Sequence, residues 1–267
     1  MKLIGDICRN VARRLDVDLV EPTNDVVIDS ILDEDLCTGL TCVTARSGVG
    51  KTTFALDVVF EKTVNSDKNT VIFSCEKSAE QIVAQLVMKL CGLNTCFVNT
   101  DDLEKRENLS RALGFLAAQR IYIESFEDSL DPTLEDIDRF LKKVDDVGLV
   151  MIDGLYCLWN EGKPEKEATK QTKESVKILK NICKKRDVPI VITTYFSRAE
   201  IKRMLSGDMS KNLLLNSGVD KLIVLYRSVV GTTISVATDF LVSDARGRYD
   251  RDTIYYDTKN RRFLREM

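Results

Sequence analysis

The sequence predicts an α/β fold with a mostly parallel, twisted sheet and helices on both of its faces. Strand-like and helix-like runs alternate from about Leu36 onward. The strand-like runs are nearly continuously apolar, as in sheets that are buried on both faces. A segment with two glycines, Ala45 to Thr52 (ARSGVGKT), joins the first of these strands to the first helix. A chain of 267 residues is long enough to bury the core of one such domain.

The elements follow one another in the order that right-handed β-α-β units require. Runs of apolar and β-branched residues predict strands at 40–45, 70–75, 120–124, 148–153, 188–194, 221–226, 234–243 and 253–257. Helical spacing of apolar residues predicts helices at 51–64, 78–91, 103–118, 133–145 and 168–186. The last two strands follow each other without a helix, so we expect an antiparallel C-terminal hairpin.

The first 19 residues have the pattern of an amphipathic helix, and we divide the chain into a linker-like helix, 1–20, and a main domain, 21–267. This helix could pack on its own domain or on a neighbouring subunit. Its apolar face contains Leu3, Ile4, Ile7, Val11 and Leu15, and its polar face contains Arg9, Arg13 and Arg14.

Composition excludes several classes of protein. The net charge of −3 and the pI near 5.4 argue against a protein that coats nucleic acid through global charge, although a local basic channel remains open. No apolar run approaches the roughly 18 residues that span a bilayer, and the amino terminus lacks a secretory apolar region, so we expect a cytoplasmic protein with no membrane partner.

The eight cysteines do not form a recognisable metal or disulfide framework. The chain has no CxxC motif and no histidine, and the four-residue gaps of Cys37/Cys42 and Cys91/Cys96 are a weak zinc signal. We expect reduced, mostly buried thiols. The absence of histidine also means that catalysis would depend on carboxylates, Lys, Arg and metal.

The ARSGVGKT segment has the features of a phosphate-binding loop. At a strand-to-helix turn the first N–H groups of the helix lack partners, and the positive end of the helix dipole lies behind them. The two glycines let the backbone curl around phosphate oxygens. Lys51 can then reach the β- and γ-phosphates, and the Thr52 hydroxyl can bind Mg²⁺. The expected nucleotide contacts are Ala45, Arg46, Ser47, Gly48, Val49, Gly50, Lys51, Thr52 and Thr53.

A bare GK[ST] triplet also arises by chance, in about one chain of this length in ten. The alternative is therefore a surface turn that carries a lysine, and Ala45 stands where the common pattern has glycine. The strand before the loop and the helix after it favour nucleotide binding.

Three further strand ends carry polar groups. Asp153 follows an apolar strand and is expected to hold Mg²⁺ opposite Thr52, although an acid at a strand end is common. Glu76 follows another strand and is the candidate that orients and deprotonates water; the alternative is a solvated residue at a helix start. Thr194 and Tyr195 end a further strand, where a hydroxyl could sense the γ-phosphate. Together these residues predict ATP and Mg²⁺ as cofactors.

Five segments occur in order along the chain: ARSGVGKTTFAL, VIFSCEKSAEQIVAQLV, GLVMIDGLYCL, VPIVITTYFSR and DFLVSDARGR. In this register they resemble the RecA-fold motor domain of DnaB-type replicative helicases, over roughly residues 25–267. The loop of that family tends to read A-R-x-x-x-G-K-T, which accounts for Ala45.

The resemblance implies a P-loop ATPase that moves on single-stranded DNA and unwinds duplex during DNA replication. It implies Lys51 and Thr52 on the phosphates and metal, Glu76 as the catalytic carboxylate and Asp153 as the acid that organises the metal. It also implies that Arg246 is an arginine finger for the adjacent subunit, and therefore a homo-oligomer, most simply a hexameric ring. Replication proteins are possible further partners.

The chain departs from the family pattern at two positions. Tyr195 stands where the family usually has Gln, and Asp244 stands where it has Lys, two residues before the finger. The resemblance also does not include the family's amino-terminal collar domain, which engages primase. These departures favour a second possibility, namely a RecA-fold ATPase that does not translocate, or a nucleotide-binding regulator or loader that acts through a protein partner.

Two basic segments are candidates for contact with nucleic acid. The better one offers Arg198, Lys202, Arg203 and Lys211 to phosphates, with Tyr195 and Phe196 nearby for stacking. The other is a lysine stripe on the predicted helix at 168–186, which we interpret as a solvated face.

Overall fold

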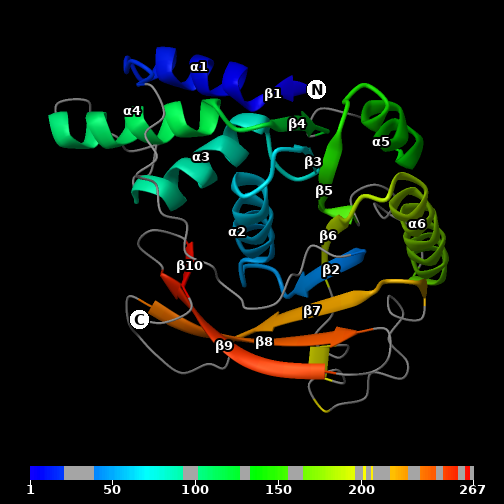
Figure 1. Cartoon of the computed structure of the whole chain (residues 1–267). Coiled ribbons are helices and arrows are strands. Elements are labelled where there is room, and N and C mark those ends of the chain that lie inside the picture. Colours follow the sequence, from blue (N-terminus) through cyan, green and yellow to red (C-terminus); the bar gives the residue numbers. More distant parts are fainter. Residues whose placement is uncertain are drawn as a thin grey trace.

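The centre of the computed structural model is one continuous, twisted sheet (Figure 1). The structure describes residues 1–20, 39–92, 102–126, 133–155, 165–195, 201–202, 206, 217–227, 235–244, 249–257 and 262–264. Within these residues the strand order is β1-β4-β3-β5-β6-β2-β7-β8-β9-β10. The strands are β1 (Lys2–Leu3), β2 (Leu40–Ala45), β3 (Asn69–Ser74), β4 (Ile121–Ser125), β5 (Val147–Asp153), β6 (Ile190–Tyr195), β7 (Lys221–Tyr226), β8 (Ser235–Asp244), β9 (Tyr249–Asp257) and β10 (Arg262–Leu264).

The six strands from β4 to β7 in this order are parallel, whereas β1 and β8 to β10 pair antiparallel to their neighbours. The predicted α/β fold with an antiparallel C-terminal hairpin is therefore confirmed. The sequence did not predict β1 or β10, because strands of two and three residues carry too few side chains for a period-2 pattern.

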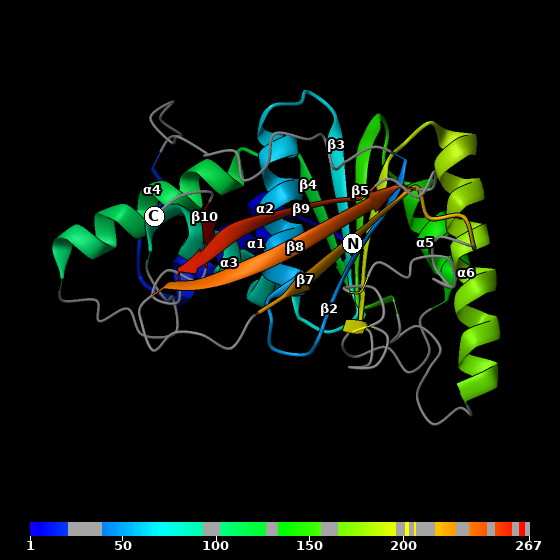
Figure 2. The ribbon, with the colours of Figure 1, turned by 90° about the horizontal axis from the view of Figure 1, so that it is seen from below.

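Helices cover both faces of the sheet, as Figure 2 shows. One face carries α1 (Ile4–Arg14), α2 (Lys51–Val64), α3 (Ala79–Cys91) and α4 (Leu103–Ala117), and the other carries α5 (Leu134–Leu141) and α6 (Glu165–Arg186). Successive side chains of a strand enter opposite cores. In β2, for example, Val43 packs with the first group of helices and Cys42 packs with the second. This two-sided burial explains why the parallel strands are apolar at most of their positions.

Helix α1 packs against α3 and α4 of the same chain. Its buried face contains Ile4, Ile7 and Val11, as the amphipathic pattern predicts, and also Cys8. Gly5 allows a close approach, because a Cβ atom there would lie 2.9 Å from the carbonyl oxygen of Ala117. In the structure this helix therefore packs on its own domain, which was one of the two predicted alternatives. The division of the chain into a linker-like helix, 1–20, and a main domain, 21–267, stays a prediction.

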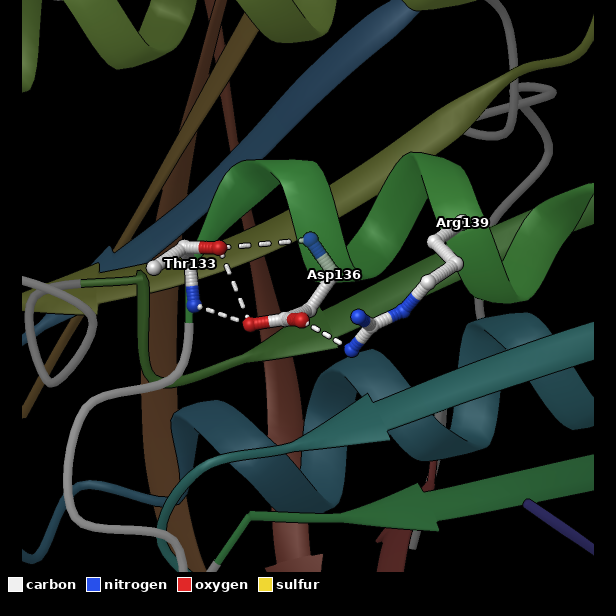
Figure 3. A network of polar contacts seen from close by, with 3 residues as sticks. All are labelled: Thr133, Asp136 and Arg139. Atoms are coloured by element: carbon white, nitrogen blue, oxygen red, sulfur yellow. Dashed lines mark hydrogen bonds and ion pairs between the residues drawn. The ribbon is translucent and has the colours of Figure 1, made fainter.

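Polar side chains set where the helices begin. Helix α5 begins at Leu134, not at 133, because Thr133 is its N-cap (Figure 3). The Thr133 hydroxyl accepts a hydrogen bond from the Asp136 amide at 3.3 Å, and the Thr133 amide donates to the Asp136 carboxylate at 3.0 Å. Arg139 forms an ion pair with the same carboxylate. The Thr133 hydroxyl also donates to the Asp136 carboxylate, at 2.9 Å. The hydrogen bonds that this carboxylate accepts from the Thr133 amide and hydroxyl, followed by the charge of Arg139, hold the pKa of Asp136 below its ordinary value.

The cysteines in the described part of the chain form no disulfide there; they are Cys8, Cys42, Cys75, Cys91 and Cys183. Burial raises the pKa of Cys8 to about 12, so this thiol stays protonated and unreactive in the folded chain. Cys37 and Cys96, whose four-residue gaps to Cys42 and Cys91 are the weak zinc signal, lie outside the described residues. No helix among the described residues combines the length and the apolar character needed to cross a membrane.

The C-terminal strand β10 packs on the beginning of α2. The ring of Phe263 meets that of Phe54 edge to face, with centroids 5.6 Å apart, and the Phe263 amide donates to Asp57 at 3.1 Å. The same ring lies 3.2 Å from the place of a Cβ atom on Gly50. The last strand of the sheet is therefore in contact with the loop that begins α2.

We expect Phe263→Ala to lower the free energy of unfolding by about 3–5 kcal/mol, because it empties a buried aromatic site against α2. Urea denaturation measures this change. Leu103→Ala, at an exposed position on α4, is the control and should change it by less than about 0.5 kcal/mol. A loss below about 1 kcal/mol for Phe263→Ala would contradict the packing described.

Candidate nucleotide-binding site

The loop between β2 and α2 has the conformation that a phosphate-binding loop requires. Gly48 and Gly50 have φ values of 79° and 106°, a region that side chains disfavour. A Cβ atom on Gly48 would meet nothing within 4 Å, so the loop is open on that side. Gly50 is the N-cap of α2 and has no side chain to cap it, and the first turn contains no acidic residue. The positive end of α2 is therefore directed at the loop without a built-in anion.

The predicted loop residues lie along this turn. Ala45 is buried at the end of β2, whereas Arg46, Ser47 and Gly48 are exposed at its tip. The remaining residues pass from the loop into the first turn of α2, where Lys51 and Thr53 are half-buried and Thr52 is buried; they are Val49, Gly50, Lys51, Thr52 and Thr53.

The buried carboxylate of Asp153 is the polar centre of the site. Its Oδ1 accepts hydrogen bonds from the hydroxyls of Thr52 at 2.8 Å and Thr193 at 2.7 Å. The Thr193 hydroxyl in turn accepts from the amide of Gly154 at 2.8 Å. Three elements, α2, β5 and β6, are therefore joined through one oxygen atom. The predicted pairing of Thr52 with Asp153 is present in the structure.

Sequence reasoning missed Thr193 and chose its neighbour Thr194. Both are buried, but successive side chains of β6 face opposite sides of the sheet, and it is Thr193 that contacts Asp153. Only the pairing register between β5 and β6 could have decided between two adjacent threonines. Tyr195, at the end of β6, is 54% exposed.

Glu76 lies in the turn that follows β3, beside Asp153. Ser74 pairs directly with Asp153 across β3 and β5, and the Cys75 amide donates to the Asp153 carbonyl at 2.9 Å. Within the described residues, Oε1 of Glu76 and Oδ2 of Asp153 are buried and have no hydrogen-bond partner. Burial raises the pKa of Asp153, and the nearby Glu76 adds to this rise, whereas Lys77 and the two threonine hydroxyls oppose it.

The oxygen atoms of Thr52 and Asp153 are suitable ligands for a magnesium ion. Mg²⁺ prefers oxygen ligands, commonly one or two carboxylates together with water and phosphate. Thr52 and Asp153 supply a hydroxyl and a carboxylate side by side, and the unpartnered Oδ2 of Asp153 is an acceptor that protein groups leave unsatisfied in the described part of the chain.

Arg227, which sequence reasoning did not select, also contacts the loop. It follows β7, and its guanidinium donates to the Val49 carbonyl at 3.0 Å and lies 4.7 Å from the ring centroid of Tyr256 on β9. Burial lowers its pKa. No sequence signal marks this arginine as part of the site. One of its partners, Val49, lies 178 residues earlier in the chain, and the other, Tyr256, lies on a later strand.

Several predicted residues are not placed in this site. Arg246, Arg198, Arg203 and Lys211 lie outside the described residues. Lys202 is exposed in the short described stretch after β6. Asp244 ends β8, with its backbone opposite Lys221 of β7.

The glycine-bearing loop joins strand β2 to helix α2, and the carboxylate of Asp153 ends β5, two strands away from β2 in the sheet. This arrangement defines a P-loop nucleotide-binding protein with a RecA-like fold. The model of the DnaB-like helicase C-terminal domain matches residues 28–263, and this chain belongs to that family.

Named relatives agree with this assignment. The chain is 27% identical to the replicative DNA helicase DnaC of Bacillus subtilis over 194 residues, and 26% identical to DnaB of Geobacillus stearothermophilus over 212 residues. These matches cover 70% and 77% of this chain but only 43% and 47% of the relatives, so the chain spans less than half of their length.

Solved structures share the fold. An ATPase domain of known structure is similar, with a TM-score of 0.70 at 17% identity over 99% of this chain and 98% of that chain. A DnaB-like replicative helicase that was solved to show its interactions with primase is also similar, with a TM-score of 0.71 at 18% identity. The latter match covers 96% of this chain and 64% of that helicase.

We expect Asp153→Asn to keep or increase the free energy of unfolding in metal-free buffer, by up to about 1 kcal/mol. An amide oxygen can accept both threonine hydroxyls, and the variant removes a buried charge whose second oxygen has no partner among the described residues. Urea denaturation tests this expectation.

The matched control is Asp57→Asn, because Asp57 is also buried but forms an ion pair with Lys89 at 3.1 Å. Breaking that pair should cost about 3 kcal/mol. If Asp153→Asn loses as much stability as Asp57→Asn, then Lys77 and the two threonine hydroxyls compensate the buried charge of Asp153 as fully as Lys89 compensates that of Asp57, and the expectation is wrong.

Proposed function

We propose that this chain is the ATP-hydrolysing motor of a ring helicase, which moves on single-stranded DNA and separates duplex DNA during replication. The observation that carries the proposal is the Thr52–Asp153–Thr193 cluster at the first turn of α2, with an unpartnered oxygen of Glu76 beside it in the described part of the chain. Membership of the DnaB-like helicase C-terminal domain family supports the helicase role, and the relatives named above are replicative helicases.

The residues of the site have separate roles in the proposed hydrolysis of ATP. The loop amides and Lys51 bind the phosphates and fix their orientation, and Thr52 and Asp153 hold Mg²⁺. When bound, Mg²⁺ would neutralise charge on the phosphate oxygens. Glu76 accepts a proton from the attacking water, since the chain contains no histidine and the Glu76 Oε1 has no hydrogen-bond partner among the described residues.

Arg246 is proposed to complete the site of the adjacent subunit. In the sequence it falls between β8 and β9, two strands that pair antiparallel. A positive side chain that arrives from a neighbour would neutralise charge on the transferred phosphoryl group, and this makes assembly into a ring a condition for turnover. A hexamer is the proposed form.

Single-stranded DNA is the proposed polymer substrate. Lys202 is exposed after β6, and it belongs to the basic segment that also contains Arg198, Arg203 and Lys211. Contacts of this kind are made to phosphates, so binding should weaken with salt and show no sequence preference.

The exposed side chain of Tyr195 favours a second candidate function. It ends the strand that carries Thr193, and it stands where the family usually has a Gln. A large exposed phenol at this strand end, whose backbone pairs with that of Ala45, offers a contact surface beside the loop. A RecA-fold ATPase that does not translocate, and instead regulates or loads a protein partner, fits this feature. Stimulation by DNA distinguishes the two candidates.

We expect single-stranded DNA to raise the ATPase rate of the wild-type chain, and we expect Lys51→Ala to abolish the activity by removing the phosphate contact.

Glu76→Gln should bind ATP with nearly wild-type affinity but turn over at least about 100-fold more slowly, because the amide cannot take the proton. Steady-state phosphate release and nucleotide binding measure these effects. A rate indifferent to DNA and RNA would favour the second candidate, and normal turnover by Glu76→Gln would remove the catalytic role.

We expect Arg246→Ala to lower turnover by about 10³-fold while nucleotide binding stays within a few-fold of wild type. Because the finger acts on a neighbour, mixed rings of Arg246→Ala and Lys51→Ala chains should recover part of the activity that each variant lacks alone. Activity that follows the simple sum of the two variants would argue against a finger in trans.

A further inference from the structure

A second lysine, Lys77, lies beside the proposed catalytic carboxylates and has no role in the mechanism above. It follows Glu76 directly, in the turn between β3 and α3. Its amide donates to the Ser74 hydroxyl at 3.1 Å, and its carbonyl accepts from the Ser125 hydroxyl at 3.0 Å. Hydrogen bonds to the ends of β3 and β4 therefore fix its backbone next to the site.

The side chain of Lys77 is half-buried and in electrostatic reach of the whole charged centre. Its ammonium donates a long hydrogen bond, 3.4 Å, to the neutral side chain of Gln85. Burial lowers the pKa of Lys77, Asp153 and Glu76 oppose that change, and Lys51 adds to it. In the other direction, Lys77 is the charged group that most lowers the pKa of Asp153.

Two carboxylates and two ammonium groups thus share one partly desolvated space. Each carboxylate has an oxygen with no hydrogen-bond partner among the described residues. Without a ligand, Lys77 supplies their compensating charge, because the ionised form of a buried acid is stabilised by a nearby cation. Thr52 and Asp153 would hold a metal ion that supplies this compensation instead, and the ammonium of Lys77 would then be available to the terminal phosphate, the most negative group of a nucleoside triphosphate.

We propose that Lys77 determines the preference of this site for a nucleoside triphosphate over a diphosphate: it neutralises Asp153 and Glu76 in the ligand-free site and contacts the terminal phosphate in the loaded one. This inference rests on the proposed nucleotide-binding function. It assigns Lys77 a different role from Lys51, which belongs to the loop and would contact the β-phosphate that both nucleotides share as well as the γ-phosphate.

The test compares the binding of a non-hydrolysable ATP analogue (adenylyl imidodiphosphate) and of ADP, each with Mg²⁺, by calorimetry on the full chain. We expect Lys77→Met, which keeps the length and removes the charge, to weaken binding of the triphosphate about tenfold or more and binding of ADP less than about twofold. Lys77→Arg should stay within about threefold of wild type for both ligands. ADP binding also reports folding, because a misfolded variant would lose both nucleotides.

Two variants separate this role from a structural one. Gln85→Met removes the neutral partner of Lys77 and should leave the preference for triphosphate unchanged. Lys142→Met, at an exposed position on the far side of the sheet from α2, should affect neither ligand. Equal losses for the two nucleotides in Lys77→Met, or no loss for the triphosphate, would overturn the inference.

The same titrations show which idea has failed. If the wild type binds both nucleotides and Lys51→Ala binds neither, nucleotide binding stands whatever Lys77→Met does, and an unchanged preference refutes only the role of Lys77. If the wild-type chain binds no nucleotide, both the proposed function and the role of Lys77 are wrong.

Discussion

The structure of the site depends on one buried carboxylate oxygen, Oδ1 of Asp153. Two hydroxyls donate to it, from Thr52 at the start of α2 and from Thr193 on β6, so the phosphate loop is held in register with the sheet. A buried carboxylate is unfavourable unless its charge is compensated. The unfavourable carboxylate lies where a metal ion and a phosphate group would be bound. An incompletely compensated negative charge at this position favours binding of a metal ion.

The loop is held from a second direction by the antiparallel strands. Arg227 contacts the Val49 carbonyl and lies over Tyr256, while Phe263 packs against Gly50 and the first turn of α2. The C-terminal strands therefore complete the wall of a site whose motif lies near the start of the domain. If the connection between β8 and β9 also carries the arginine finger, the same strands would link the site of one subunit to that of the next.

Charge inside the site is arranged in opposing pairs. Lys51 and Lys77 lie near Asp153 and Glu76. The two carboxylates oppose the fall in the pKa of Lys77 that burial causes and Lys51 adds to it, while Lys77 opposes the rise in the pKa of Asp153. A site of this kind is close to neutral without a ligand and responds to both a cation and an anion. This arrangement is consistent with a net charge of only −3 on the whole chain, because the binding of a highly charged ligand depends on local rather than global charge.

The sequence by itself determined the fold class, the order of the strands and helices along the chain apart from the short strands β1 and β10, and the glycine-bearing loop. These features are local: apolar runs buried on both faces, helical periodicity, and a motif whose spacing alone predicts its turn. The sequence also placed Thr52 with Asp153, because the carboxyl ends of parallel strands meet at one edge of the sheet. Only the tertiary structure chose Thr193 over Thr194, brought Arg227 onto the loop and set Lys77 beside two carboxylates. Each of these depends on strand register or on contacts between residues far apart in the chain. A single sequence records side-chain types and spacing but not which distant residues share a hydrogen bond, and that is why these parts of the site required the folded chain.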